Sequence, residues 1–249
     1  MTITAPPMNQ QPVHPGFTAW RSVLLLSESE QQTCRDVHRL HQLALEGFRP
    51  PGLDTAVPTL PQRHVLYVAS RHPAERETAA RRFVAGRPEQ LVVQSPVQPN
   101  WQHLLDTGRV TQAASSDVAV TYYPGDTVAL RVIANPTYRD IQTRKRRVHN
   151  SAEACGNWFR RHLERHGVDV APHHVTVGKD ERLTGTDSKG HTSGTGESGN
   201  QLHITCREIR ATGTIQDPAA FYQALQTGIG HGKAYGCGLL HDPSRHPLE

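Results

Sequence analysis

The sequence predicts an α+β chain of two βαββαβ-type modules in tandem, each an antiparallel sheet backed by helices. Two patterns lead to this fold class: short apolar, β-branched runs alternate with amphipathic helical segments, and this order partly repeats in the second half. A length of 249 residues is enough to bury a substantial core, as one large domain or two small ones. We expect a disordered, proline-rich tail at 1–16, an N-terminal module at 17–135 and a C-terminal module at 136–249.

The first half supplies four predicted strands and three predicted helices. After the first strand, Val37, Leu40 and Leu43 recur at helical spacing, with Ser27, Ser29 or Thr33 as candidate caps. The predicted strands are 20–26 (WRSVLLL), 64–70 (HVLYVAS), 89–95 (EQLVVQS) and 127–135 (TVALRVIAN), and the other two helices are 73–83 (PAERETAARRF) and 101–108 (WQHLLDTG).

The second half begins with an amphipathic helix at 151–167, capped by Ser151 and ended by Gly167. A second helix at 217–228 has Asp217 as its cap and Pro218 in its first turn. The remaining predicted elements are strands at 173–179 and 201–215, a mobile Gly/Ser/Thr-rich hairpin loop at 183–200, a glycine loop from 228, and a last short strand at 236–240.

Charge and cysteine usage limit the partners and the compartment. Lys and Arg number 27 against 23 acids, with 16 histidines and a pI near 9.0, which suits an anionic partner without requiring one. The run Arg144, Lys145, Arg146 and Arg147 is either a solvated loop or a nucleic-acid contact. Four scattered cysteines indicate neither a zinc cluster nor a disulfide framework. No apolar run approaches the about 20 residues of a membrane span and no signal peptide is evident, so we expect a cytoplasmic protein without a membrane partner.

The segment GIGHGKAYGCGLL, residues 228–240, contains five glycines. It is not a Walker A loop, because Gly228 and Gly232 enclose three residues and Ala234 follows Lys233. It is not a dinucleotide fingerprint either, because Lys233 takes the place of the third glycine. Two interpretations stay open: a helix-to-strand turn without a ligand, or a backbone that approaches phosphates closely, with Lys233 as a point charge.

His38 and His41 lie three residues apart on the first predicted helix, so both imidazoles can meet one substrate. Two histidines can divide the cleavage of an RNA phosphodiester: one deprotonates the 2′-OH and the other protonates the leaving 5′-oxygen. The alternatives are a pair of surface histidines, or half of a metal site, for which HExxH spacing and further ligands are missing.

Two His-x-Thr tripeptides begin at His174 and His203. Paired tripeptides of this kind resemble the signature of the 2H phosphoesterases, although both lie in the second half, only 29 residues apart. Alternation in a half-exposed strand explains them equally.

Four stretches together resemble one family. GIGHGKAYGCGLL resembles the C-terminal glycine loop of RAMP-type CRISPR proteins, in the form typical of the Cas6e (CasE/Cse3) family. The others are similar to that family in order and approximate spacing: RDVHRLHQL, LRVIANPT and AEACGNWFRRHL. On this resemblance His41 matches the catalytic histidine, Lys233 and its glycines match the loop, and His38 stands where the family has a tyrosine.

The resemblance implies tandem ferredoxin-like domains and a crRNA-processing endoribonuclease that needs no metal or other cofactor. It implies cleavage of the CRISPR repeat stem-loop RNA (pre-crRNA) to a 2′,3′-cyclic phosphate, retention of the crRNA, and assembly with Cascade subunits. We expect the RNA to meet Gly228, Gly230, Gly232, Lys233, Gly236, Gly238, Arg144, Lys145, Arg146 and Arg147. The rivals are a RAMP subunit that binds crRNA without cutting it, and a 2H-type cyclic phosphoesterase.

Overall fold

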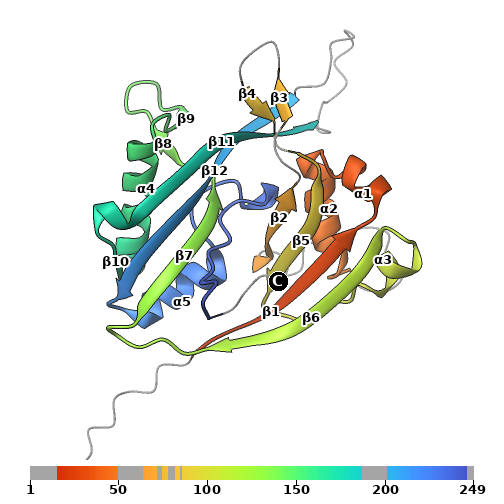
Figure 1. Ribbon diagram of the computed structural model, residues 1–249, viewed down its shortest axis with the longest axis horizontal. Helices are drawn as coiled ribbons and strands as arrows, with labels where there is room; N and C mark the ends of the chain where they lie inside the picture. Colours follow the sequence, from red (N-terminus) through yellow and green to blue (C-terminus); the bar gives the residue numbers. More distant parts are fainter. Residues whose placement is uncertain are drawn as a thin grey trace, which may run out of the picture.

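The computed structural model describes residues 16–49, 64–71, 75–77, 82–84, 86–186 and 201–245. Two sheets, antiparallel except for one parallel pair in the second, lie side by side, each with helices against one face (Figure 1). The predicted disorder of the tail concerns residues outside these ranges, apart from Gly16. The same holds for 187–200 of the predicted loop, whereas 183–186 belong to a strand.

The first sheet has the strand order β2-β5-β1-β6. Its strands are β1 (Phe17–Leu26), β2 (Leu66–Arg71), β5 (Pro88–Ser95) and β6 (Val110–Val120). The helices of this half are α1 (Glu28–Thr33), α2 (Val37–Glu46) and α3 (Gln102–Asp106). Leu24, Leu40 and Leu43 are fully buried in the core between this sheet and its helices.

The helix predicted after the first strand is divided in two. Ser27 caps α1 as expected, and α1 ends at Cys34. Asp36 then adopts an extended backbone and its carboxylate accepts a hydrogen bond from the His38 amide at 2.8 Å, so that a second helix begins. An N-cap of this kind accepts a hydrogen bond from one of the first amides of the new helix, which have no partner within that helix, and so stabilises the break between α1 and α2.

The second sheet contains β7 (Thr127–Ala134), β10 (Val168–Asp169), β11 (Val175–Thr186) and β12 (Gln201–Ile215). Its helices are α4 (Ala152–Arg165), capped by Ser151, and α5 (Pro218–Thr227), capped by Asp217, both as predicted. β7 pairs antiparallel with β12, from Ala134 opposite Arg207 to Thr127 opposite Thr214. The prediction that β7 completes the N-terminal module is therefore wrong, and we place the domain boundary between β6 and β7.

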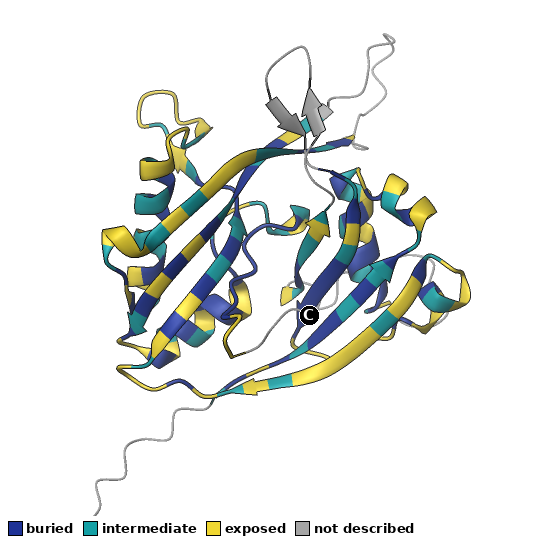
Figure 2. Cartoon of the chain, in the orientation of Figure 1, coloured by how far each residue is buried: buried dark blue, intermediate teal, exposed yellow. Residues whose placement is uncertain are grey.

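β6 takes the place that the prediction gave to β7. It was missed because most of its residues are exposed, as Figure 2 shows, and it lacks the apolar alternation of a core strand. In the second domain, His241 bridges to Arg131 on the outer edge of β7, and the Gly238 amide donates to the Ile133 carbonyl at 2.7 Å. The segment predicted as a last strand thus lies beside β7 in the sheet, as an irregular fourth strand of this domain. Both domains then have the ferredoxin-like strand order, as predicted.

Residues of the first half also reach the second sheet. The predicted helix at 73–83 is wrong: the backbone forms β3 (Glu75–Glu77) and β4 (Arg82–Val84), and β4 pairs in parallel with β11. β8 (Thr137–Arg139) and β9 (Arg146–Val148) form a separate hairpin after β7. Among the described residues, no helix is long and apolar enough to cross a membrane.

Candidate active site

The N-terminus of α2 is fixed at the junction of the two domains. The amide and hydroxyl of Thr186, at the end of β11, donate to Asp36 Oδ2 at 2.8 and 2.6 Å. Val37 is fully buried in a cluster with residues of β11 and β12. A Cβ on Gly185 would come within 2.9 Å of Val37 and 3.3 Å of the His38 ring, so glycine permits this close approach. The helix that carries the histidine pair is therefore held by the second domain.

Each histidine of the pair packs against a tyrosine. The His38 ring meets the Tyr235 ring edge to face, with centroids 5.5 Å apart, and the His41 ring stacks on Tyr67 at 6.1 Å. Both imidazoles are half-buried, and His38 Nε2 and His41 Nδ1 have no hydrogen-bond partner within the described part of the chain. Both nitrogens are themselves buried, and each lacks the partner that a buried polar atom normally has.

The glycine loop lies against this histidine pair. Its short helix η3 (Lys233–Tyr235) stands between Gly232 and Gly236, both in the left-handed region at φ 82° and 78°. The Tyr67 hydroxyl donates to the Ala234 carbonyl at 2.6 Å, and a Cβ at Gly236 would lie 3.1 Å from the Tyr67 ring. The glycine loop and the histidine pair thus meet at one place, with Tyr67 as the connecting side chain.

Burial affects the protonation of His41. It lowers the pKa of His41 below its ordinary value, and the charge of His38 lowers this pKa further. Because His41 is then neutral near pH 7, it can accept a proton. Within the described ranges no three His, Cys, Asp or Glu side chains come together as a metal-binding set.

Lys233 opens η3 but acts on the other side of the loop. Its charge lowers the pKa of His166 at the end of α4 and that of His231 in the loop. Burial lowers the pKa of Lys233 itself. Lys233 therefore belongs to the flank of the glycine loop that faces α4.

The basic run 144–147 lies on the β8–β9 hairpin, which projects beside α4 (Figure 1). All four side chains are exposed, and Arg144 has a left-handed backbone at φ 57°. Arg147 pairs with Asp140 at 2.9 Å. The link to the loop is Arg146, whose charge lowers the pKa of His231. The structure thus places this run near the α4 flank of the loop, and not beside His38 and His41.

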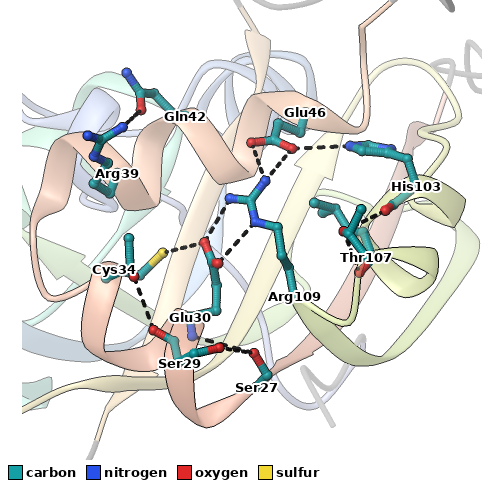
Figure 3. A network of polar contacts seen from close by, with 12 residues as sticks. Ser27, Ser29, Glu30, Cys34, Arg39, Gln42, Glu46, His103, Thr107 and Arg109 are labelled. Carbon is teal, nitrogen blue, oxygen red and sulfur yellow. Dashed lines mark hydrogen bonds and ion pairs between the residues drawn. The ribbon is translucent and has the colours of Figure 1, made fainter.

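A partly buried ion network, which the sequence did not reveal, fixes the other end of α2 (Figure 3). Arg109 donates to both oxygens of Glu30 on α1, at 2.8 and 3.0 Å, and to both oxygens of Glu46 on α2, at 2.8 Å. His103 Nε2 lies 3.2 Å from Glu46. Hydrogen bonds from Arg109 hold the pKa of Glu30 below its ordinary value. The network therefore binds α1, α2 and the start of β6 together behind the histidine pair.

The structure separates the two His-x-Thr histidines. His203 on β12 pairs opposite Thr184, and His174 immediately precedes β11, ten residues away along the same strand. At about 3.3 Å per residue this is a separation of roughly 30 Å. One small cyclic phosphate cannot meet both side chains, so the 2H phosphoesterase alternative is wrong.

Tandem ferredoxin-like domains that meet at a glycine-rich loop are the arrangement that the resemblance to RAMP-type CRISPR proteins implies. A model of the family described as CRISPR associated protein matches residues 20–241, and the chain therefore belongs to this family. CRISPR-associated endoribonuclease Cse3 of Thermus thermophilus is 27% identical over 157 residues, which is 61% of this chain and 72% of that protein.

Solved structures share the fold. Thermus thermophilus Cse3 bound to an RNA representing a pre-cleavage complex gives a TM-score of 0.67 at 21% identity, covering 90% of this chain and 98% of that one. Cas6e from Escherichia coli K-12 gives 0.56 at 20% identity, covering 90% and 97%. A chain of a CRISPR RNA-guided surveillance complex gives 0.53 at 19% identity, covering 89% and 98%. The resemblance to Cas6e inferred from the sequence is confirmed.

Proposed function

We propose that this chain is a metal-independent endoribonuclease that cleaves CRISPR repeat stem-loop RNA. The observation that carries the proposal is the junction itself, where two half-buried histidines lie against the glycine loop, His38 through Tyr235 and His41 through Tyr67. That arrangement puts proton-transfer groups beside backbone that a phosphate can approach closely.

In this reaction neutral His41 takes the proton of the 2′-OH, and the 2′-oxygen attacks the adjacent phosphorus. Protonated His38 gives a proton to the 5′-oxygen as the bond between phosphorus and that oxygen breaks. The products are a 2′,3′-cyclic phosphate and a free 5′-OH, so atoms and charge balance without water or a metal. The lowered pKa of His41 favours this division of roles. Much of the rate would come from holding the 2′-oxygen in line.

The partners follow from the same family. Thermus Cse3 is bound to RNA in solved structures, and another structural relative is part of a surveillance complex. We propose that this chain likewise binds the repeat hairpin through its glycine loop and the β8–β9 hairpin, retains the crRNA and joins Cascade. We place it in the cytoplasm, where its four free, buried thiols would stay reduced.

The test is incubation of the purified protein with its repeat RNA in EDTA. We expect one discrete cut, and none when a single 2′-deoxy nucleotide precedes the scissile phosphate. His41→Ala should abolish cutting and leave hairpin affinity within a few-fold, because the imidazole acts on the reacting atoms. Inhibition by EDTA or cleavage of the deoxy substrate would favour metal-activated water instead. Tight binding without cleavage by the wild-type protein would identify a non-catalytic RAMP subunit.

A further inference from the structure

A second group of histidines lies across the glycine loop from His38 and His41. It comprises His162 on α4, His166 at the C-terminal cap of α4 and His231 in the loop, and we call it the α4–loop cluster. The His162 ring packs on Trp158 with centroids 4.5 Å apart. Trp158 in turn packs against the loop, because a Cβ on Gly230 would lie 2.7 Å from its ring. The backbone of His231 bridges to Asn135 at the end of β7. The loop therefore packs on the face of α4 that carries Trp158 and His162.

The surroundings of the cluster are basic. The charged groups outside the cluster that lower the pKa values of its histidines come from α4, the loop and β9, and they are Arg161, Arg165, Lys233 and Arg146. The nearby acids are engaged elsewhere: Glu164 pairs with Arg160 at 2.9 Å, and Asp217 caps α5 by accepting from the amides of Ala219 and Ala220. Positive groups from three elements thus gather with no carboxylate to neutralise them among the described residues.

We propose that the α4–loop cluster is an RNA phosphate site that takes up protons when RNA binds. The inference rests on the proposed function, which supplies the RNA, and adds a binding site distinct from the catalytic pair. A phosphate placed between α4 and the loop would offset the mutual repulsion of the cations and favour imidazolium over imidazole. His231 is exposed and Lys233 half-buried, so the cluster is open to a polyanion.

The free protein holds these histidines ready for protonation by a ligand. Burial, followed by the charges of Arg165 and His166, lowers the pKa of His162 to about 4. Burial also lowers the pKa of His166, against the opposite effect of its hydrogen bond with the backbone of Ala220. The pKa of His231 is lowered by burial and then by Arg146. Near pH 7 all three are largely neutral and become charged only if RNA raises their pKa.

The sign of the linkage follows. Each pKa is low in the free protein and higher in the complex, so affinity rises as the pH falls through the value in the complex. The affinity stops rising once the pH falls below the pKa in the free protein, which lies below 6.5 for His231 and near 4 for His162. Each proton taken up makes binding about tenfold tighter per pH unit within this window.

The experiment uses the full chain and a repeat hairpin made uncleavable by a 2′-deoxy nucleotide. Affinity is measured between about pH 5.5 and 8 at fixed salt, and proton uptake is measured by calorimetry in buffers of different ionisation enthalpy. We expect uptake of about one proton or more, with His231→Gln and His162→Gln each removing part of it. His173→Gln, an exposed histidine in the η2 turn (Pro172–His174), is the matched control and should keep the wild-type slope.

Affinity that does not change with pH, or a slope unaltered in both variants, would overturn the inference. His162 packs on Trp158, so the thermal stability of the His162→Gln variant is measured and its affinity is compared with wild type under conditions where both are folded. His231 is exposed, and its variant gives the independent test. The cleavage assay separates the two proposals: a protein that cuts RNA but binds it without proton uptake refutes only the cluster. A protein that binds no repeat RNA at any pH refutes both.

Discussion

Tyr67 connects the proposed base to the glycine loop, and the change Tyr67→Phe tests this connection alone. The phenylalanine keeps the ring that stacks on His41 and removes the hydroxyl that donates to the Ala234 carbonyl at 2.6 Å. A hydrogen bond of this kind contributes about 0.5–1.5 kcal/mol net. Ala234 is exposed and its carbonyl can turn to water, so we expect a stability loss of about 1 kcal/mol or less.

The effect on catalysis depends on how much of this energy holds the loop against the histidines. If all of it does, 1 kcal/mol corresponds to a rate loss of about fivefold, and we expect a two- to fivefold loss, roughly, in single-turnover cleavage of the repeat hairpin. Tyr67→Leu also removes the ring beside His41 and should lower the rate more than about tenfold, through loss of positioning.

The matched control is Tyr222→Phe on α5. The Tyr222 hydroxyl accepts from the Tyr122 amide at 2.8 Å and donates to the Tyr122 carbonyl at 3.2 Å, away from both histidines. It should lower the free energy of unfolding by an amount similar to Tyr67→Phe and leave cleavage unchanged. If Tyr67→Phe also cleaves at the wild-type rate, the hydroxyl only stabilises the fold and the positioning argument is refuted.

Three further predictions concern the histidine pair, the basic hairpin and the ion network. His38→Ala should lower the single-turnover rate about 10²-fold or more, whereas His38→Tyr should keep most activity and remove one limb of the bell-shaped pH–rate profile. The acid limb of that profile should lie below 6.5, because the pKa of His41 is lowered. An unchanged profile in His38→Ala would show that His38 takes no part in proton transfer. Neutralising residues 144–147 should reduce the slope of RNA affinity against salt by about one unit for each phosphate that these side chains neutralise, and an unchanged slope would identify a solvated loop. Arg109→Leu should cost about 3 kcal/mol in urea unfolding near pH 7, the lower end for a broken buried pair because its side chain is 36% exposed. The depressed pKa of Glu30 means that this stabilisation is present above 4.5 and lost as the pH falls through the folded-state value, so wild type and variant should converge in acid.

Local signals predicted the parts of the fold that local interactions determine. Helices α4 and α5 begin at the predicted caps, Ser151 and Asp217, because a side-chain oxygen next to an amphipathic run satisfies free amides. The partner of β7 could not be predicted, since alternate buried residues such as Val128 and Leu130 suit either sheet. The sheet to which β7 belongs is decided by its pairing with β12, about 80 residues later in the chain.

The candidate site divides in the same way. The spacing of His38 and His41 on one helix is a local property and was predicted. Their aromatic neighbours were not, because Tyr67 and Ala234 are 167 residues apart in the chain and meet only through docking of the domains. The Arg109 network escaped for the same reason: its acids come from two helices, and nothing near Arg109 in the sequence marks a buried partner.

The attachment of α2 to the second domain has a consequence for how such a protein can evolve. The helix that carries the proposed base and the loop that packs against it are far apart in the sequence. They are joined through hydrogen bonds of Asp36 with Thr186 and of Tyr67 with Ala234. An exchange of halves between two relatives would replace one partner of each of these hydrogen bonds while leaving both halves able to fold. Such chimaeras should be soluble but catalytically poor unless residues 36–41, 67, 185–186 and 232–236 are inherited as a set. The gene should therefore tolerate point substitution better than recombination near its middle.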